Sequence, residues 1–167
     1  MRSLQPKDGR KRNGVLVFTR FIAESQVLVN GLKARGINAA IVTGDTPKKE
    51  RERFVKDFKE GKITVVANSG VFTTGFDHPA LDTVILARPT NSLSLYYQMC
   101  GRAIRPFQGK QAWLLDMCGT YRKFGKVSDL RIECPDSRLR DLMAAPMSAV
   151  LRTFAIRFQS TRSHILS

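Results

Sequence analysis

The sequence predicts an α/β fold in which helices cover both faces of a parallel β-sheet. Short continuous apolar runs, the first at residues 15–18, alternate with segments whose apolar residues recur at helical spacing. Continuous apolar runs are typical of strands that are buried on both faces. The connections are short, and strands that alternate with helices in this way favour parallel pairing through crossover helices.

The expected elements follow one another in a regular order. A strand over residues 15–18 precedes a helix over 22–35, and Gly36 is placed to end that helix. A strand over 37–42 then precedes a helix with Thr46 as its N-cap and Pro47 as its first residue. Further strands are expected at 63–67, 83–87 and 112–115, with a helix over 93–104 before the last of them.

One domain with short extensions accounts for the length of the chain. Its 167 residues, 43% of them apolar, suffice for one core and hardly for two. We expect a basic linker or arm at residues 1–13, the domain at 14–135, and a helical extension and tail at 136–167. The extension is expected because its apolar residues fall on one helical stripe: Met147, Val150, Leu151, Phe154, Ala155 and Phe158.

Charge is the strongest compositional signal. The chain carries 28 Lys and Arg against 14 Asp and Glu, a formal net charge of +14. Such an excess favours a polyanionic partner, and nucleic acid is the first candidate. A ribosomal protein, a membrane-surface protein or a merely soluble basic protein remain alternatives.

Cysteine usage and hydropathy restrict the compartment. The chain has three cysteines, an odd number without CxxC spacing, so neither a disulfide framework nor a zinc knuckle is expected. We therefore expect buried thiols, no metal site and a reducing compartment. No segment approaches the roughly 18 apolar residues of a membrane span, and the N-terminus lacks the apolar core of a signal peptide. These features predict a soluble, cytoplasmic protein without a membrane partner.

The sharpest local pattern surrounds two arginines. Gln98, Arg102 and Arg105 stand at i, i+4 and i+7, so a continuous helix would place them on one face. Two guanidinium groups at this spacing repel each other, and an anion such as a triphosphate, or an acidic partner, would offset that repulsion. A solvated basic face on a surface helix remains the alternative.

Four motifs in order resemble those of superfamily 2 helicases. The segment Gln98-x-x-Gly101-Arg102-x-x-Arg105 resembles motif VI, and residues 73–77, Thr-Thr-Gly-Phe-Asp, resemble motif V. Val17-Phe18-Thr19 resembles motif IV, and Thr43-Gly44-Asp45 with Arg51 resembles the family's phosphate-contacting turn and the helix after it. All four are expected at the carboxyl ends of strands.

This resemblance covers about residues 14–133 and implies a fold and a role. It implies the second RecA-like domain, which is the P-loop NTPase-like helicase C-terminal domain of an ATP-dependent helicase or translocase. The amino-acid sequence of residues 73–79, 87–90 and 94–98 is most similar to that of RadD (YejH)-type DNA repair helicases. DNA is therefore expected as the partner in preference to RNA.

The resemblance implies a nucleotide-facing set of residues. Asp77 matches the acid that accepts a hydrogen bond from the ATP ribose, although a loop or helix cap is the alternative role for such an aspartate. Arg105 matches the arginine finger and Arg102 its catalytic companion at the γ-phosphate. The set that binds ATP is Gly75, Asp77, Gln98, Arg102 and Arg105.

The resemblance also implies contacts with nucleic acid through backbone amides, small hydroxyls and arginines. Such contacts hold phosphates without reading the base sequence, as a translocating motor requires. Strand-edge or capping hydroxyls, and a solvated charge for Arg51, are the alternatives. Where many relatives carry Gln before that arginine, this chain has Lys48. The matching positions are Thr19, Arg20, Thr43, Gly44, Arg51, Thr73 and Thr74.

The other half of an ATP site is missing from the sequence. No G-x-x-x-x-G-K-[ST] segment occurs, since Gly109-Lys110 is followed by Gln111, and no Asp-Glu pair of the DExH kind occurs either. We therefore expect the chain alone not to hydrolyse ATP. An N-terminal RecA-like domain, in cis or in trans, would hold the phosphates and Mg²⁺, and the chain is expected to be a fragment, a split subunit or an excised domain.

Two other functions remain open at this point. An ATP-independent nucleic-acid-binding module would use the same loops, but it has no need of Arg102 and Arg105 at finger spacing. A nucleotide-dependent transferase would need a glycine-rich turn after the first strand, and Thr19-Arg20-Phe21 is not one.

Overall fold

The computed structural model describes residues 12–69 and 78–127 together with the backbone of 157–160. Its elements alternate between strands and helices along the chain. They are β1 (Val15–Thr19), α1 (Ile22–Lys33), β2 (Ala39–Thr43), α2 (Lys48–Lys59), β3 (Val65–Ser69), β4 (Thr83–Ala87), α3 (Leu93–Gly101), β5 (Trp113–Asp116), α4 (Thr120–Phe124) and β6 (Arg157–Ser160).

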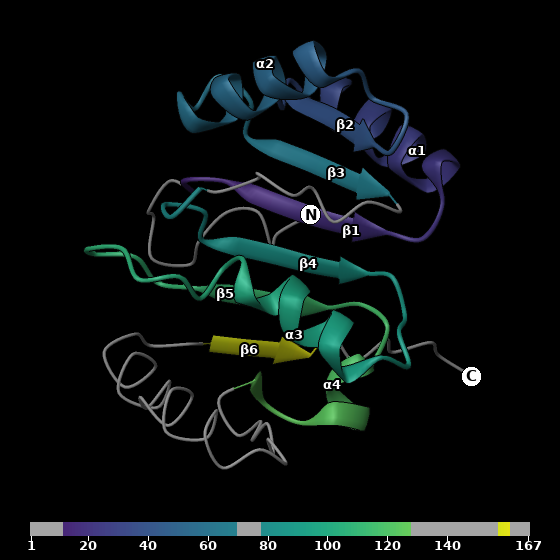
Figure 1. Cartoon of the computed structure of the whole chain (residues 1–167), viewed down its shortest axis with the longest axis vertical. Helices are drawn as coiled ribbons and strands as arrows, with labels where there is room; N and C mark the ends of the chain where they lie inside the picture. The colour runs from purple at the N-terminus through teal and green to yellow at the C-terminus, as the bar shows by residue number, and fades with distance from the viewer. Residues whose placement is uncertain (1–11, 70–77, 128–156, 161–167) are drawn as a thin grey trace.

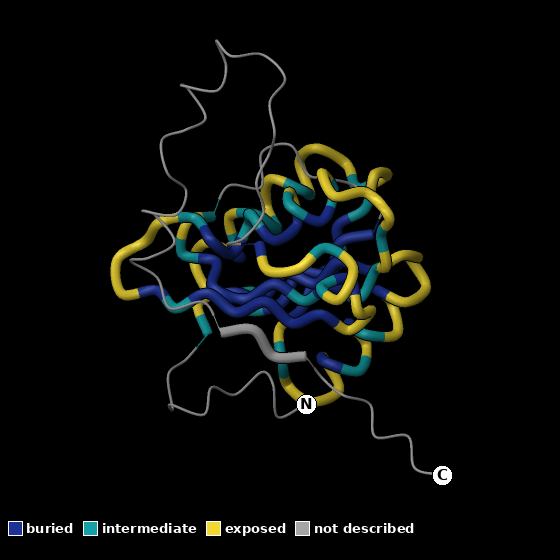
Figure 2. The backbone as a smooth tube through the Cα atoms, turned by 90° about the horizontal axis from the view of Figure 1, so that it is seen from below, coloured by how far each residue is buried: buried dark blue, intermediate teal, exposed yellow. Residues whose placement is uncertain are grey.

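The strands form one parallel sheet in the order β2-β3-β1-β4-β5-β6 (Figure 1). The central strand β1 pairs on both sides, with Val15 opposite Val65 of β3 and opposite Thr83 of β4. Every residue of β1 and β3 is buried, as the continuous apolar runs predicted. Figure 2 shows these buried strands as a band through the middle of the molecule, with exposed helix surfaces outside it.

Helices cover both faces of the sheet. On one face, Val29 and Leu32 of α1 pack against Val15, Val17 and Val65. The opposite face carries a larger cluster, in which α2 and α3 contribute. Its main members are Leu16, Phe18, Val66, Phe58, Tyr96 and Met99. Because successive strand residues point to opposite faces, this division confirms the predicted α/β class.

Both α1 and α2 end in a turn closed by a glycine with positive φ. Gly36 has a φ of 73°, and the Ile37 amide donates to the Leu32 carbonyl at 3.0 Å. Gly61 also has a φ of 73°, and the Lys62 amide donates to the Asp57 carbonyl at 2.8 Å. These bonds define the Schellman motif, which satisfies the last carbonyls of a helix.

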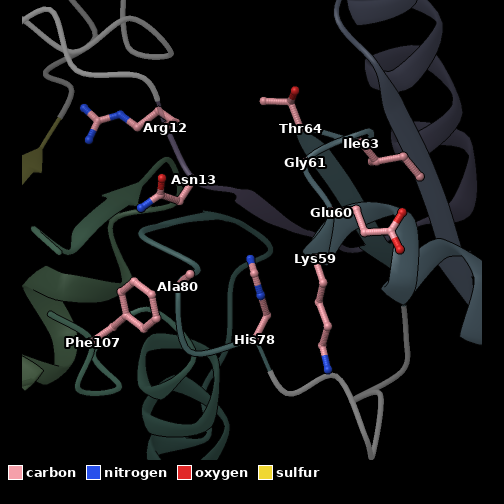
Figure 3. A pocket seen from close by; sticks show the side chains of 10 residues that line it. All are labelled: Arg12, Asn13, Lys59, Glu60, Gly61, Ile63, Thr64, His78, Ala80 and Phe107. Carbon is pink, nitrogen blue, oxygen red and sulfur yellow. The ribbon is translucent and has the colours of Figure 1, made fainter. Parts of the chain in front are cut away.

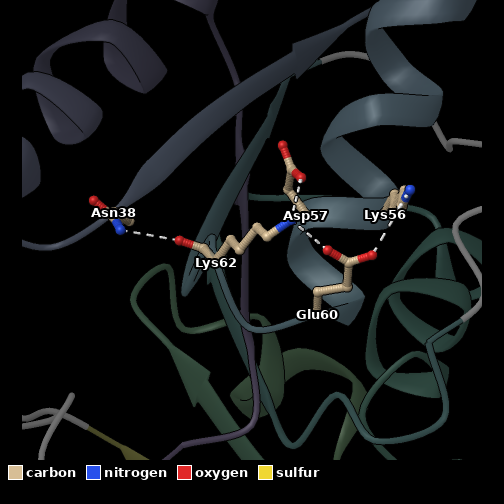
Figure 4. A network of polar contacts seen from close by, with 5 residues as sticks. All are labelled: Asn38, Lys56, Asp57, Glu60 and Lys62. Atoms are coloured by element: carbon tan, nitrogen blue, oxygen red, sulfur yellow. Dashed lines mark hydrogen bonds and ion pairs between the residues drawn. The ribbon is translucent and has the colours of Figure 1, made fainter.

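Surface charges surround the second of these turns (Figure 4). The Lys62 ammonium lies 2.6 Å from a Glu60 oxygen and 3.9 Å from Asp57, and Asn38 donates to the Lys62 carbonyl at 3.0 Å. The hydrogen bond between Lys62 and Glu60 raises the pKa of Lys62 and lowers the pKa of Glu60. All these groups reach solvent, so the network positions the turn more than it stabilises the fold.

The start of α2 differs from the expectation. Pro47 occupies the N-cap position and the helix begins at Lys48, so Pro47 as the first helical residue was wrong by one position. Thr46 does not cap the helix with its side chain. Its Oγ1 instead accepts a hydrogen bond from the Thr43 amide at 2.9 Å, which draws the hydroxyl back into the preceding turn.

The C-terminal extension also differs. Residues 157–160 form strand β6, which pairs in parallel with β5. The helix expected from Met147 through Phe158 is therefore wrong at its end, because an apolar residue at Phe158 also suits a strand. Residues 147–156 of that stripe lie outside the described residues, and the division at 135 stays a prediction. In the described part of the chain, no helix is long and apolar enough to cross a membrane.

Candidate functional site

Helix α3 presents the first residues of the arginine motif. Ser92 caps the helix by accepting a hydrogen bond from the Leu95 amide at 3.2 Å. Tyr96, Met99 and Cys100 are buried against the sheet. Gln98 lies on the exposed side, where its Nε2 donates to Ser94 Oγ at 3.3 Å.

The two arginines do not share a continuous helix, and this corrects the expectation of one face through Arg105. The helix ends at Gly101, and the chain tightens into a turn in which the Ala103 amide donates to the Cys100 carbonyl at 3.0 Å. Glycine is a poor helix former, and Pro106 disfavours a helical conformation at Arg105, so both ends of the segment oppose continuation.

The turn that follows α3 is nevertheless anchored. Ala103 is fully buried and Ile104 is 9% exposed, and both belong to the larger core cluster. Arg102 and Arg105 flank this apolar pair and are half-buried. A pair of guanidinium groups is thus attached to a segment whose backbone is fixed by packing.

A buried lysine joins this turn to the start of β4. Lys110 is 6% exposed, and its Nζ donates to the Pro79 carbonyl at 2.8 Å and to the Leu81 carbonyl at 3.0 Å. The pKa of Lys110 is lowered to about 8, mainly by burial; the charge of Asp82 opposes this shift and the charge of Arg105 adds to it.

Asp82 is the charged partner next to that lysine. Its carboxylate accepts hydrogen bonds from the Asn13 amide at 2.9 Å and from Thr83 Oγ1 at 2.7 Å. Burial nevertheless raises the pKa of Asp82 above its usual value, while those bonds and the charges of Arg12 and Lys110 oppose the rise. The amino ends of β4 and β5 therefore carry a compact polar cluster.

Arg105 accordingly lies toward the amino ends of the strands, not the carboxyl ends where all motifs were expected. Helix α3 starts after the carboxyl end of β4 and returns across the sheet, so the turn after it lies near the start of β5. The charge of Arg105 also lowers the pKa of Lys110, which binds carbonyls before β4, and this agrees with that position. Gly75 and Asp77 of the nucleotide set lie outside the described residues.

The expected nucleic-acid residues after β1 lie at the opposite, carboxyl edge. Thr19 is 3% exposed, and its hydroxyl lies 2.6 Å from Ser25 Oγ, so this hydroxyl points into the protein. Arg20 is exposed, with its guanidinium carbon 5.0 Å from the centre of the Phe21 ring. Glu24 accepts hydrogen bonds from the Arg20 and Phe21 amides at 2.9 and 3.1 Å and fixes this turn.

The residues after β2 lie on the same edge, because β1 and β2 are parallel and both flank β3. Arg51 Nη2 donates to the Thr46 carbonyl at 3.1 Å and to the Gly44 carbonyl at 3.4 Å. The arginine thus braces the turn that carries Thr43 and exposed Gly44. Thr73 and Thr74 lie outside the described residues.

Comparison with known proteins identifies the family. The model of the helicase conserved C-terminal domain matches residues 3–106, which is more than half of the chain. The chain belongs to this helicase C-terminal domain family.

Two relatives are similar to the chain in sequence, and one solved structure is similar to it in fold. The chain is 38% identical over 117 residues, 70% of its length, to a Saccharomyces cerevisiae protein described as the ATP-dependent helicase IRC3, of which it covers 17%. It is 31% identical over 101 residues, 60% of its length, to the human ATP-dependent RNA helicase DDX42, of which it covers 11%. The chain thus spans less than a fifth of the length of either relative.

The solved structure is the E. coli DEAD-box protein SrmB bound to the regulator of ribonuclease activity A. The two share 24% identity and a TM-score of 0.60, with 78% of this chain and 75% of that chain covered. The likeness is one of fold, and it matches the parallel sheet with flanking helices.

A pocket of about 300 Å³ lies near the amino edge of the helicase C-terminal domain (Figure 3). It is lined by the turn after α2 and by residues around His78 and Phe107. The charged side chains of Arg12, Lys59 and Glu60 point away from one another in Figure 3. They do not converge on a common point, so the pocket lacks the arrangement of a polar ligand site.

Cysteines and metal ligands add no further site in the described ranges. Cys100 is buried as expected, and burial raises its thiol pKa to about 12. Cys118 is exposed, so the expectation of buried thiols was wrong there, because it follows the carboxyl end of β5 in a loop. Cys134 lies outside the described residues. Residues 12–69 and 78–127 hold no group of three side chains that suits a metal ion.

Lys110 is the residue that sequence reasoning missed. The sequence shows it only as Gly109-Lys110, an incomplete phosphate-loop match. Its burial depends on carbonyls that lie far away in the chain, and no local pattern reports such contacts.

Proposed function

We propose that this helicase C-terminal domain is the second motor domain of an ATP-dependent superfamily 2 helicase or translocase. Arg105 would act as the arginine finger, Arg102 as its companion at the γ-phosphate, and Asp77 would bind the ribose. The observation that carries the proposal is the anchored turn, where buried Ala103 and Ile104 hold two half-buried arginines at a fixed place. Preorganised positive charge is what phosphoryl transfer requires.

The nucleotide site would be completed by a second domain. The sequence has no Walker A segment and no DExH pair, so an N-terminal RecA-like domain would cradle the phosphates and hold Mg²⁺. Gly75 and Gln98 would complete the nucleotide-facing side of this chain. The chain alone is then not an ATPase.

Nucleic acid would cross the carboxyl edge of the sheet. Arg20 and the braced turn at Gly44 are exposed there, and the Thr19 hydroxyl is not, so Thr19 would contribute through its backbone. Thr43, Thr73, Thr74 and Arg51 complete the proposed set. The net charge of +14 favours such a polyanion.

DNA is the proposed substrate, with a repair-related role, because residues 73–79, 87–90 and 94–98 resemble RadD-type helicases. The human relative is named an RNA helicase, so both polymers belong in the test. Binding of oligo(dT) and oligo(U) of equal length, measured by fluorescence anisotropy, decides between them. Tighter binding of oligo(U) would replace DNA by RNA in the proposal.

Replacement of Arg105 tests the motor assignment. In the assembled two-domain enzyme, Arg105→Ala should lower ATP turnover by about 10³-fold, the scale of an arginine finger, while nucleic-acid binding changes by no more than about twofold. Arg122→Ala on exposed α4 is the matched control and should leave turnover unchanged. Full turnover by Arg105→Ala would refute the assignment of Arg105 as the arginine finger, whereas absence of turnover in the wild-type assembly would favour an ATP-independent binding module.

A further inference from the structure

Lys110 is an unusual lysine because it is almost fully buried and forms no salt bridge with any residue that the structure describes, although Asp82 lies nearby. Its side chain is 6% exposed and ends on two backbone carbonyls, those of Pro79 and Leu81. Lysine is seldom buried unless its ammonium is paired or fully hydrogen-bonded. The two carbonyls replace water around the ammonium. The surrounding fold must therefore hold the Lys110 side chain in this position.

The lysine joins two separate segments. One segment is residues 78–82, which enters β4 and directly follows Asp77 in the sequence. The other is the turn from Arg102 to Lys110, which the Lys110 amide closes by donating to the Phe107 carbonyl at 3.2 Å. The described segment that follows Asp77 in the sequence and the turn that carries the proposed finger are thus tied together by one side chain.

We propose that Lys110 is a positioning residue for nucleotide hydrolysis. Its side chain clamps the segment that follows Asp77 to the turn after Arg105, and so fixes the distance between these two segments. This inference rests on the proposed function for its catalytic consequence. The clamp itself is a property of the domain alone. A small displacement of a charge-stabilising group costs a large factor in rate, so a loosened clamp lowers kcat more than it weakens binding.

The charges around the ammonium give the clamp a pH dependence. Asp82 faces it from the start of β4 and attracts it, Arg105 faces it from the turn and repels it, and Arg12 lies beside Asp82. Burial lowers the pKa of Lys110 to about 8, whereas a solvated lysine titrates near 10.5. When the clamp opens and Lys110 becomes solvated, its amine therefore takes up a proton. The closed state becomes more favourable as the pH rises above about 8.

Hydrogen exchange of the isolated chain tests the clamp. The Leu81 amide donates to the His78 carbonyl at 3.0 Å and reports on the segment. Lys110→Met should speed its exchange by about tenfold or more, since a hydrogen-bonded cation is lost and two carbonyls lose their donor. Corrected for intrinsic rates, wild-type exchange should slow from pH 7 to 9, and Lys110→Met should lack that change. Lys33→Met on the exposed end of α1 is the control.

Steady-state kinetics of the assembled two-domain enzyme test the positioning role. Lys110→Met should lower kcat by about 10- to 100-fold with KM changed by no more than about twofold, and Lys110→Arg should restore part of kcat. Unchanged exchange at Leu81, or unchanged kcat, would overturn the proposal. If Lys110→Met does not fold, Lys110→Gln, which is shorter and uncharged, takes its place, and unchanged exchange at Leu81 in that variant would overturn the proposal equally. A wild-type assembly without ATP turnover would refute the proposed function and the positioning role. Hydrogen exchange of the Leu81 amide in the isolated chain would still show whether the clamp exists.

Discussion

At the scale of single residues, Gly14 has no room for a side chain. A Cβ atom at this position would lie 2.6 Å from Cζ of Phe58, a ring that is fully buried at the end of α2. Real atoms do not approach so closely, so only glycine lets β1 begin beneath this ring. The residue therefore sets how tightly α2 packs on the sheet.

We expect Gly14→Ala to lower the free energy of unfolding by about 1–3 kcal/mol, because the Phe58 ring or the strand must shift. Chemical denaturation at equilibrium measures the change. Gly31→Ala in α1 is the control, since its added Cβ meets only the end of Arg35 at 3.6 Å and alanine favours a helix. Equal destabilisation by both variants would show that the contact with Phe58 has no special weight.

The sequence predicted residue types better than side-chain directions. Arg102 and Arg105 were singled out by their spacing and by the resemblance to motif VI, and their roles stay predictions, although the turn that holds them is well packed. The direction of the Thr19 hydroxyl was not predictable, because it depends on Ser25 of the following helix. Lys110 was missed for the same reason, since its partners Pro79 and Leu81 are remote in sequence.

At the scale of elements, Tyr96 joins α3 to α4. Its hydroxyl donates to the Gly125 carbonyl at 3.1 Å, and its ring stacks on Phe124 with centroids 5.5 Å apart. Burial raises the pKa of Tyr96 well above its usual value, so the hydroxyl stays protonated and keeps donating. The helix that carries the arginine turn is thereby held at its middle.

Tyr96→Phe should lower the free energy of unfolding by about 1 kcal/mol, because the ring remains and one hydrogen bond is lost. Thermal and urea unfolding, followed by circular dichroism, measure the loss. A variant as stable as the wild type would mean that the Gly125 carbonyl finds another donor. A loss several times larger would mean that the ring itself has moved.

Element boundaries shifted from the sequence prediction for a physical reason. The second and third strands were expected from Ile37 and Ile63, but they begin at Ala39 and Val65. Both isoleucine amides instead donate to carbonyls of the preceding helix, Ile37 to Leu32 and Ile63 to Asp57. An apolar residue after a helix-ending glycine serves the Schellman turn as well as it would serve a strand.

At the scale of the whole molecule, the alternation of strands and helices was enough to predict a parallel sheet covered on both faces. The placement of Arg105 near the amino edge was not predicted, because it depends on where α3 ends relative to β5. Strand β6 was also missed. Its residue Phe158 continues an apolar stripe with helical spacing, and only pairing with β5 selects the strand.

The stability of the whole fold should depend on pH through Lys110. Folding lowers the pKa of this lysine to about 8 from 10.5, so the unfolded chain binds one more proton between these values. Stability then rises with pH, by at most about 1.4 kcal/mol per unit. The window is pH 8 to 9, because the unfolded Cys100 thiol ionises near 9 and opposes the trend above it. Urea denaturation should show this rise in the wild type and lose it in Lys110→Met.

The proposed function requires that this domain complete an ATP site that it cannot form alone. The direct measurement is steady-state ATP hydrolysis with single-stranded nucleic acid present. Three samples are compared: this chain, the N-terminal RecA-like domain of its own protein or neighbouring reading frame, and the two together. We expect turnover at helicase rates only when both domains are present. Turnover by the isolated chain that equals that of the two domains combined would contradict the proposed function. So would a combination that is no faster than the N-terminal domain alone.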